Sequence, residues 1–182
     1  IRYARDNPGK LNYGSSGVGS TYHLGAEFFA NLAKVQMTHV PYKGQGPAVQ
    51  DLLAGHLQVM FDAYSSAVPN MKAGRVRALG LTSAKRNPDL PDLPTVEESG
   101  VAPGVISSSW FGFFAPSKVP EARRAEIVNA LQKVAASPVA QDKMRGFGLI
   151  PVFQGPKDFD KFMNDESRRW GGVIQSQKIA ID

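Results

Sequence analysis

Apolar residues recur with the period of an α-helix between residues 20 and 35. One helical face carries the apolar positions Leu24, Phe28, Leu32 and Val35. A hydroxyl at the start of such a run can accept a hydrogen bond from a backbone N–H that has no partner in the first helical turn. The pattern therefore predicts a helix from residue 20 that is capped by Ser20 or Thr21.

Short apolar runs alternate with further helical patterns through the first half of the chain. The runs that predict strands are residues 10–13, 37–42, 57–61 and 76–81. Helical patterns at residues 48–54 and 66–73 stand between them, and each is followed by a glycine. Strand, loop and helix repeated three times are typical of a parallel sheet with helices on both faces. This half is therefore predicted to have an α/β fold.

The second half follows a proline-rich connector at residues 83–104. Beyond it, β-prone runs occur at residues 105–114 and 149–153. Helical patterns begin at Pro120, Ser137 and Lys157. Because one or two strands are too few for a separate sheet, this half is expected to need a partner. We therefore expect a nearly complete α/β lobe at residues 1–104 and an incomplete segment of another lobe at residues 105–182.

The chain begins with IRYARDN, which reads as the end of a helix, followed by Pro8 and Gly9. A helix end without its beginning predicts that the sequence is a fragment lacking an N-terminal part. The apolar faces of the second half, around Ile127 and Phe159, would then lack their cover. Large uncovered apolar surfaces normally find a partner. The chain is therefore expected to self-associate through its second half, or to leave that half loosely ordered.

The composition is that of an ordinary globular protein, with 42% hydrophobic and 20% charged residues. No apolar run reaches the length of about 18 residues that a membrane-spanning helix needs. The absence of cysteine excludes disulfides, thiolate catalysis and cysteine metal sites. The formal charge is +5, but the basic residues are scattered along helical patterns with acids nearby. This distribution favours the binding of small anions over the binding of nucleic acid.

A glycine- and serine-rich turn, YGSSGVGSTYHLG, opens the first predicted helix. It resembles a nucleotide phosphate loop, but Ser20 stands where that loop requires a lysine. A dinucleotide-binding motif would need glycine in place of Tyr22, and a nucleophile elbow would need glycine in place of Val18. Without a lysine, backbone N–H groups and hydroxyls at a helix start suit a carboxylate better than a triphosphate. A tight turn with no ligand explains the same residues equally well.

The chain lacks a residue pattern for metal or covalent chemistry. His23, His39 and His56 lie on different predicted elements and have no i, i+4 spacing. No pairing of a nucleophile with a base is evident in the sequence. We therefore predict no metal site, no cofactor and no catalytic residue.

Four long motifs follow one another in the order of a known family. They are NPGKLNYGSSGVGSTYHL, THVPYKGQGPAVQDLLAGHLQVMFD, AGRVRALGLTSAKRNPDLPDLPTVEESG and SWFGFFAPSKVP. Over its whole length the chain resembles the extracytoplasmic solute-binding proteins of tripartite tricarboxylate transporters, which are also called Bug receptors.

The resemblance implies a periplasmic-binding-protein-like (type II) architecture, in which two lobes close on a ligand in the manner of a Venus flytrap. It implies a periplasmic receptor that captures a small organic carboxylate and delivers it to membrane permease subunits, without catalysis. Which carboxylate is bound stays open. An enzyme or sensor domain on the same scaffold is the alternative, because lobes of this type are reused for both.

The resemblance also implies the positions that contact the ligand. In the turn after the first strand they are Ser15, Ser16, Gly17, Gly19, Ser20, Thr21 and His23. After the second and third strands they are Tyr42, Lys43, Gly44 and Asp62. Lys43 either contacts the anion or steers it from the rim. Asp62 either orients a water, a ligand amine or a ligand hydroxyl, or it caps the next helix.

Overall fold

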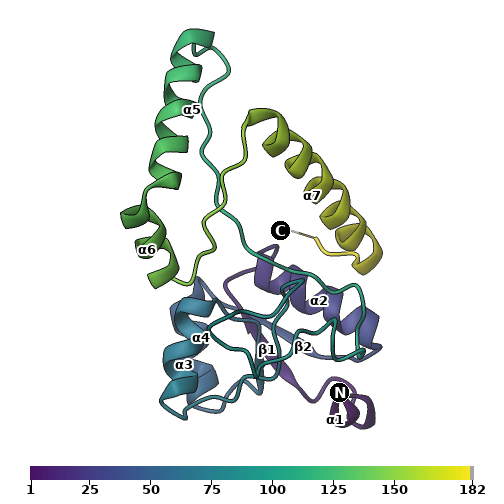
Figure 1. The fold of residues 1–182 in the computed structure, drawn as a ribbon. Helices are drawn as coiled ribbons and strands as arrows, with labels where there is room; N and C mark the ends of the chain where they lie inside the picture. The colour runs from purple at the N-terminus through teal and green to yellow at the C-terminus, as the bar shows by residue number, and fades with distance from the viewer. Residues whose placement is uncertain (181–182) are drawn as a thin grey trace. The chain divides into compact units, whose positions relative to one another are not determined.

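The computed structural model describes residues 1–180 of the chain. In the first part, helices alternate with strands (Figure 1): α1 (Arg2–Asp6), β1 (Asn12–Ser15), α2 (Thr21–Ala33), β2 (Thr38–Pro41), α3 (Gln45–Leu53), β3 (Val59–Met60) and α4 (Tyr64–Lys72). After a long irregular segment come α5 (Glu121–Ala136), α6 (Pro138–Gly146) and α7 (Pro156–Gln177). Among these helices, none in the described part of the chain is both long and apolar enough to cross a membrane.

The three strands form one parallel sheet in the order β2-β1-β3. At the centre, Tyr13 of β1 pairs with His39 of β2 on one side and with Val59 of β3 on the other. Helix α2 connects β1 to β2, and α3 connects β2 to β3, which is the alternation that makes neighbouring strands parallel. The predicted α/β fold class is confirmed. All three strands therefore present their carboxyl ends at the same edge of the sheet.

Three β-prone segments do not form strands: residues 76–81, 105–114 and 149–153. The first of them makes one isolated bridge, between Leu81 and Thr95. Apolar side chains in these runs are exposed, with 73% of Leu79 and 79% of Ile150 accessible to solvent. A strand requires a neighbouring backbone for its N–H and C=O groups. Within residues 1–180 these runs have only that bridge and one further backbone hydrogen bond to a distant segment, from the N–H of Ser107 to the carbonyl oxygen of Thr82 at 2.8 Å. The prediction of strands at 76–81 and 149–153 was wrong.

The sequence places Pro47 in a favourable first helical position before the pattern at 48–54, but helix α3 begins at Gln45. Gly44 precedes the helix with a φ of 110°, a conformation that glycine adopts at no steric cost. Pro47 is then the third helical residue. Its missing N–H costs little there, because the first four N–H groups of a helix have no partner within the helix. The glycine, and not the proline, sets the start of α3.

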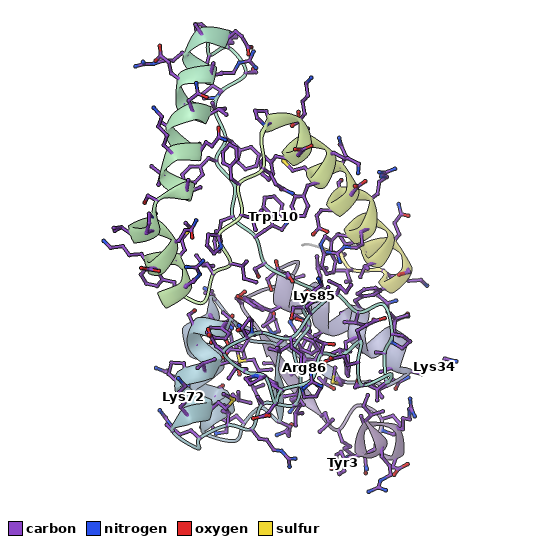
Figure 2. All side chains as sticks on the ribbon, viewed as in Figure 1. Tyr3, Lys34, Lys72, Lys85, Arg86 and Trp110 are labelled. Atoms are coloured by element: carbon purple, nitrogen blue, oxygen red, sulfur yellow. The ribbon has the colours of Figure 1, made fainter. Side chains whose placement is uncertain are left out.

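The proline-rich connector is irregular but it is anchored to the α/β part. Ala102 at its end and Val105 just after it belong to a buried cluster that also contains Ala33 of α2. Within the connector, Arg86 (Figure 2) donates from Nε to both carboxylate oxygens of Glu98, at 3.0 and 2.9 Å. The connector therefore packs as part of the domain in spite of its lack of regular structure.

The chain divides into two compact units. The first unit comprises residues 1–109 and the end of α7 from Trp170, and the second comprises residues 110–169. The predicted lobes, residues 1–104 and 105–182, remain a prediction about the receptor as a whole.

The second unit is organised around aromatic rings. Trp110 (Figure 2) lies edge-on to Phe159 and Phe162 of α7, with ring centroids 5.7 and 5.4 Å apart. Such pairs are favourable because the positive edge of one ring meets the negative face of the other. Phe111 and Phe113 nevertheless expose 82% and 79% of their surface. The predicted self-association of this half stays a prediction.

Candidate ligand-binding site

The three segments predicted to contact a ligand meet at the carboxyl edge of the sheet. The loop after β1 and the turn after β2 are joined by a hydrogen bond from the N–H of Tyr42 to the carbonyl oxygen of Ser15, at 3.0 Å. The turn after β2 and the end of β3 are joined because Nε2 of Gln45 donates to Oδ1 of Asp62. Open parallel α/β sheets bind their ligands at this edge.

The loop between β1 and α2 is a tight turn that ends in a helix cap. Gly17 and Gly19 have φ values of 133° and 76°, which other residues rarely adopt. Ser20 is the N-cap of α2, and its Oγ accepts a hydrogen bond from the N–H of His23 at 3.3 Å. The predicted helix start and cap are confirmed, with Ser20 as the cap and Thr21 as the first helical residue.

Two hydroxyls of this loop are free to bind a ligand. Within residues 1–180, the side chains of Ser16 and Thr21 make no hydrogen bond to the protein. Both residues are half-buried. The first N–H groups of α2 lie next to them and have no intrahelical partners, and the helix dipole places partial positive charge at the same point. This combination can hold a carboxylate group.

Ser15 is also a predicted contact, but its hydroxyl is engaged within the protein. The residue is fully buried. Its Oγ lies 2.7 Å from Nε2 of His39, and 3.1 and 3.2 Å from the carbonyl oxygen and the nitrogen of Gly17. The geometry of Ser15 supports the loop from beneath, and a direct contact with a ligand stays a prediction.

His23 also contacts the loop from beneath. The residue is 6% exposed, and its Nδ1 accepts a hydrogen bond from the N–H of Gly19 at 3.0 Å. Its ring stacks on that of His39, with centroids 3.9 Å apart and planes 8° apart. His39 was considered at the sequence level only as a metal ligand. Its role could have been predicted from its position in β2, which is the neighbour of β1, the strand that leads into the loop.

Burial controls the protonation of this cluster. It lowers the pKa of His23, and it lowers the pKa of His39 to about 4, with the neighbouring His23 as a second cause. Burial also raises the pKa of Tyr13, whose hydroxyl donates to the carboxylate of Glu27. All three rings are therefore neutral at pH 7.

The chain is expected to lose stability as the pH falls from about 6.5 to about 4. Over this range the unfolded chain protonates His39, whereas the folded chain does not, because its pKa is about 4 instead of 6.5. Allowing for solvent screening at this partly exposed ring, the loss should be about 1 kcal/mol between pH 7 and pH 5. Urea unfolding at the two pH values measures it. His39→Gln should remove this part of the pH dependence, and an unchanged dependence would contradict the assignment.

The turn after β2 contributes Tyr42, Lys43 and Gly44. The hydroxyl of Tyr42 donates to Oδ2 of Asp51 at 2.6 Å, which fixes the turn to α3 and raises the pKa of the tyrosine. Lys43 is exposed and, among the described residues, has no ion-pair or hydrogen-bond partner. Its ammonium group is therefore available to attract an anion.

Asp62 does not cap α4. The N-cap of that helix is Ala63, and Oδ1 of Asp62 accepts a hydrogen bond from the N–H of Ala63 itself, at 2.7 Å. The same oxygen accepts from Nε2 of Gln45, a residue that sequence reasoning did not propose as a contact. Within residues 1–180, Oε1 of Gln45 is buried without a hydrogen-bond partner. Gln45 and Asp62 are therefore linked at the edge of the sheet, and Oε1 of Gln45 is an acceptor that lacks a partner there.

No group of three histidine, aspartate or glutamate side chains in the described part of the chain could hold a metal ion. One groove of the first unit is lined by residues that include Glu27, Lys34, Met37 and Gln177, and by none of the predicted contacts.

Unpaired N–H groups and hydroxyls at the carboxyl edge of a parallel α/β sheet are typical of the class of small-ligand binding domains. The chain itself is a member of the tripartite tricarboxylate transporter receptor family: the family model described as "Tripartite tricarboxylate transporter family receptor" matches residues 1–179. The resemblance seen in the sequence motifs is confirmed. Because this is a family of receptors, the prediction of a binding protein rather than an enzyme is also confirmed.

Relatives are about one third identical to the chain over the aligned residues. The "UPF0065 protein in tcbD-tcbE intergenic region" of Pseudomonas sp. (strain P51) is 36% identical over 179 residues, which are 98% of this chain and 53% of the relative. The "UPF0065 protein in clcB-clcD intergenic region" of Pseudomonas knackmussii is 32% identical over 90% of this chain and 97% of the relative. The chain thus spans about half the length of the first of these relatives.

Solved structures confirm the periplasmic-binding-protein-like fold. The chain superposes on R. palustris Rpa4515 with adipate at a TM-score of 0.89 and 36% identity, covering 98% of this chain and 60% of that one. It superposes on MatC (Rpa3494) from Rhodopseudomonas palustris with bound malate at 0.82 and 31% identity, covering 95% and 60%. The periplasmic binding protein BugD gives 0.82 at 29% identity, covering 98% and 60%.

Proposed function

We propose that the chain forms the ligand-binding lobe of a periplasmic receptor, which captures a small organic carboxylate and delivers it to a tripartite tricarboxylate transporter. The observation that carries the proposal is the loop between β1 and α2. There, the hydroxyls of Ser16 and Thr21 have no partner within residues 1–180 and lie beside the start of a helix. The adipate and malate held by the two R. palustris proteins support the same ligand class.

The chemistry of the loop supports a carboxylate rather than a polyphosphate. The loop has no lysine, so it offers hydrogen-bond donors and a partial positive charge but no full charge. One carboxylate can be satisfied in this way, because each of its oxygens accepts two or more hydrogen bonds. Lys43 is exposed near the same edge and adds a long-range attraction for anions.

The acceptors at the end of β3 support a ligand that also carries a hydrogen-bond donor. A second carboxylate next to Asp62 would be repelled, whereas a ligand hydroxyl or amine can donate to Asp62 or to Oε1 of Gln45. Malate carries such a hydroxyl, and adipate does not. The proposed site therefore binds a carboxylate of either acid at the loop between β1 and α2, and it distinguishes malate from adipate at the end of β3.

The test is a titration of the 182-residue chain with adipate and malate, followed by NMR of the backbone amides. We expect saturable binding and the largest chemical-shift changes in residues 15–21. The matched control is 1,6-hexanediol, which has the length of adipate without its charges and should cause no such change. Shift changes confined to other residues would place the ligand elsewhere, and no saturable binding of either acid would contradict the proposal for this chain.

Replacing Lys43 with Ala is expected to slow carboxylate association several-fold at low ionic strength while leaving the dissociation rate unchanged. The reason is that an exposed charge steers an anion toward the site but contributes little once the ligand is bound. Stopped-flow kinetics at low and high salt measures both rates. Lys72→Ala, which removes another exposed lysine, from the last turn of α4, is the control. A faster dissociation in Lys43→Ala would show a direct contact instead of steering.

A further inference from the structure

Three aromatic rings from three different elements stack beneath the loop between β1 and α2, which is called the ligand loop below. Tyr13 comes from β1, His39 from β2 and His23 from α2. The ring of His39 lies between the other two, with its centroid 4.9 Å from that of Tyr13 and 3.9 Å from that of His23. The plane of the His39 ring is tilted by only 21° from that of Tyr13 and by 8° from that of His23. The register of the parallel sheet pairs Tyr13 with His39 and so brings these two rings together.

Each histidine holds one of the two glycines that shape the loop. His23 accepts a hydrogen bond from the N–H of Gly19 at Nδ1, at 3.0 Å. His39 contacts Oγ of Ser15 through Nε2 at 2.7 Å, and the same Oγ is within hydrogen-bond distance of both backbone polar groups of Gly17. The two glycines of this loop that have positive φ are therefore both linked to imidazole rings, Gly19 directly and Gly17 through Ser15.

The bond from Gly19 requires one protonation state of His23. An N–H can be donated to Nδ1 only while that nitrogen has a free lone pair, so the neutral ring must carry its proton on Nε2. A proton added at Nδ1 would place two N–H groups against each other. The contact between His39 and Ser15 makes no such demand, because the hydroxyl can either donate or accept.

Two opposing influences act on the protonation of His23. Glu27, one turn further along α2, attracts a proton to the ring, although its carboxylate already accepts from the hydroxyl of Tyr13. The buried position of the ring opposes protonation and is the larger influence on the pKa of His23. His39 from β2 stacks on the ring, and its own pKa is lowered by burial and by His23. These groups, with the neutral Tyr13 from β1, are the titratable side chains of the cluster.

We propose that His23 and His39 are positioning residues for the ligand loop, and that protonation of His23 releases the N–H of Gly19 and weakens carboxylate binding. The part that concerns the ligand rests on the proposed function. Neutral His23 holds the loop in the conformation that presents Ser16 and Thr21, so less order has to be gained when the anion binds. A protonated ring no longer fixes that backbone.

Two substitutions of His23 separate its hydrogen bond from its charge. His23→Asn keeps an acceptor oxygen near the position of Nδ1 but cannot be protonated, and His23→Leu removes the acceptor while filling the space. With adipate as the probe at pH 7.5, we expect His23→Asn to bind within about threefold of the parent and His23→Leu about tenfold more weakly. Equal affinity of His23→Leu and the parent would overturn the positioning role.

The pH dependence supplies the second measurement. Calorimetry from pH 8 to pH 4.5 should show the parent losing about fivefold more affinity than His23→Asn over this range. The titration of adipate itself is the same for both proteins and cancels in the comparison. A charged ring could instead attract the anion directly. An affinity that rises in the parent relative to His23→Asn as the pH falls would therefore overturn the proposal, as would identical pH profiles.

A readout without ligand separates this inference from the proposed function. Long-range ¹⁵N–¹H spectra of the free 182-residue chain should show Nδ1 of His23 unprotonated at pH 7.5, and the amide signal of Gly19 should move as His23 titrates. A proton found on Nδ1 at pH 7.5 would overturn the positioning role. If these signals appear as expected but no variant binds adipate or malate, the proposed function fails and the coupling of His23 to the loop stands.

Discussion

Thr21→Val is expected to weaken carboxylate binding about tenfold to a hundredfold, and Ser16→Ala is expected to do the same. Neither hydroxyl has a hydrogen-bond partner within residues 1–180, so a bound anion is the acceptor that each can serve. A hydrogen bond to a charged group contributes about 1.5–3 kcal/mol, and each 1.4 kcal/mol corresponds to about tenfold in affinity. Because valine keeps the shape of threonine, the loss of affinity in Thr21→Val measures the contribution of the hydroxyl to binding. Calorimetry with adipate and malate gives the values.

Thr38→Val is the matched control. Thr38 begins β2, at the opposite end of the sheet from the loop, and its hydroxyl donates to the carbonyl oxygen of Gly9 at 2.9 Å. Its removal should lower stability slightly and leave the affinity for either acid unchanged. If Thr21→Val and Ser16→Ala both bind as tightly as the parent, the loop between β1 and α2 is not the binding site.

Gly14→Val is expected to lower the free energy of unfolding by about 3 kcal/mol. A Cβ atom on this residue of β1 would lie 2.4 Å from Cδ1 of Leu57 and 3.5 Å from Cβ of Ala48. Leu57 is 3% exposed and Ala48 is fully buried, so neither can move aside without displacing other core atoms. Urea unfolding followed by circular dichroism measures the difference.

The control for Gly14 is a glycine with open surroundings. Gly171 lies inside α7, and a Cβ there would meet no atom within 4 Å. Gly171→Ala should therefore raise stability by about 0.5–1 kcal/mol, because alanine loses less conformational freedom than glycine when a helix forms. A Gly14→Val variant as stable as the parent would show that β1 and the residues before β3 do not pack as described.

The sequence by itself determined most of the helices and the place of the loop between β1 and α2. The start of α6 is an example: Ser137 was predicted to open it together with Pro138, and Ser137 is its N-cap, accepting a hydrogen bond from the N–H of Ala140 at 3.1 Å. Caps, glycine turns and the 3.6-residue period involve residues only a few positions apart. Local features of this kind can be recognised in a single sequence, and they were enough to place the glycine-rich loop before α2.

Only the tertiary structure decided which residues support that loop. His39 reaches Ser15 across 24 positions, and Gln45 reaches Asp62 across 17, through contacts that exist because the strands are arranged as β2-β1-β3. The same dependence made residues 76–81 a false strand. An apolar run becomes a strand when a neighbouring backbone accepts and donates its hydrogen bonds, and that neighbour is set by the order of the sheet rather than by the run itself.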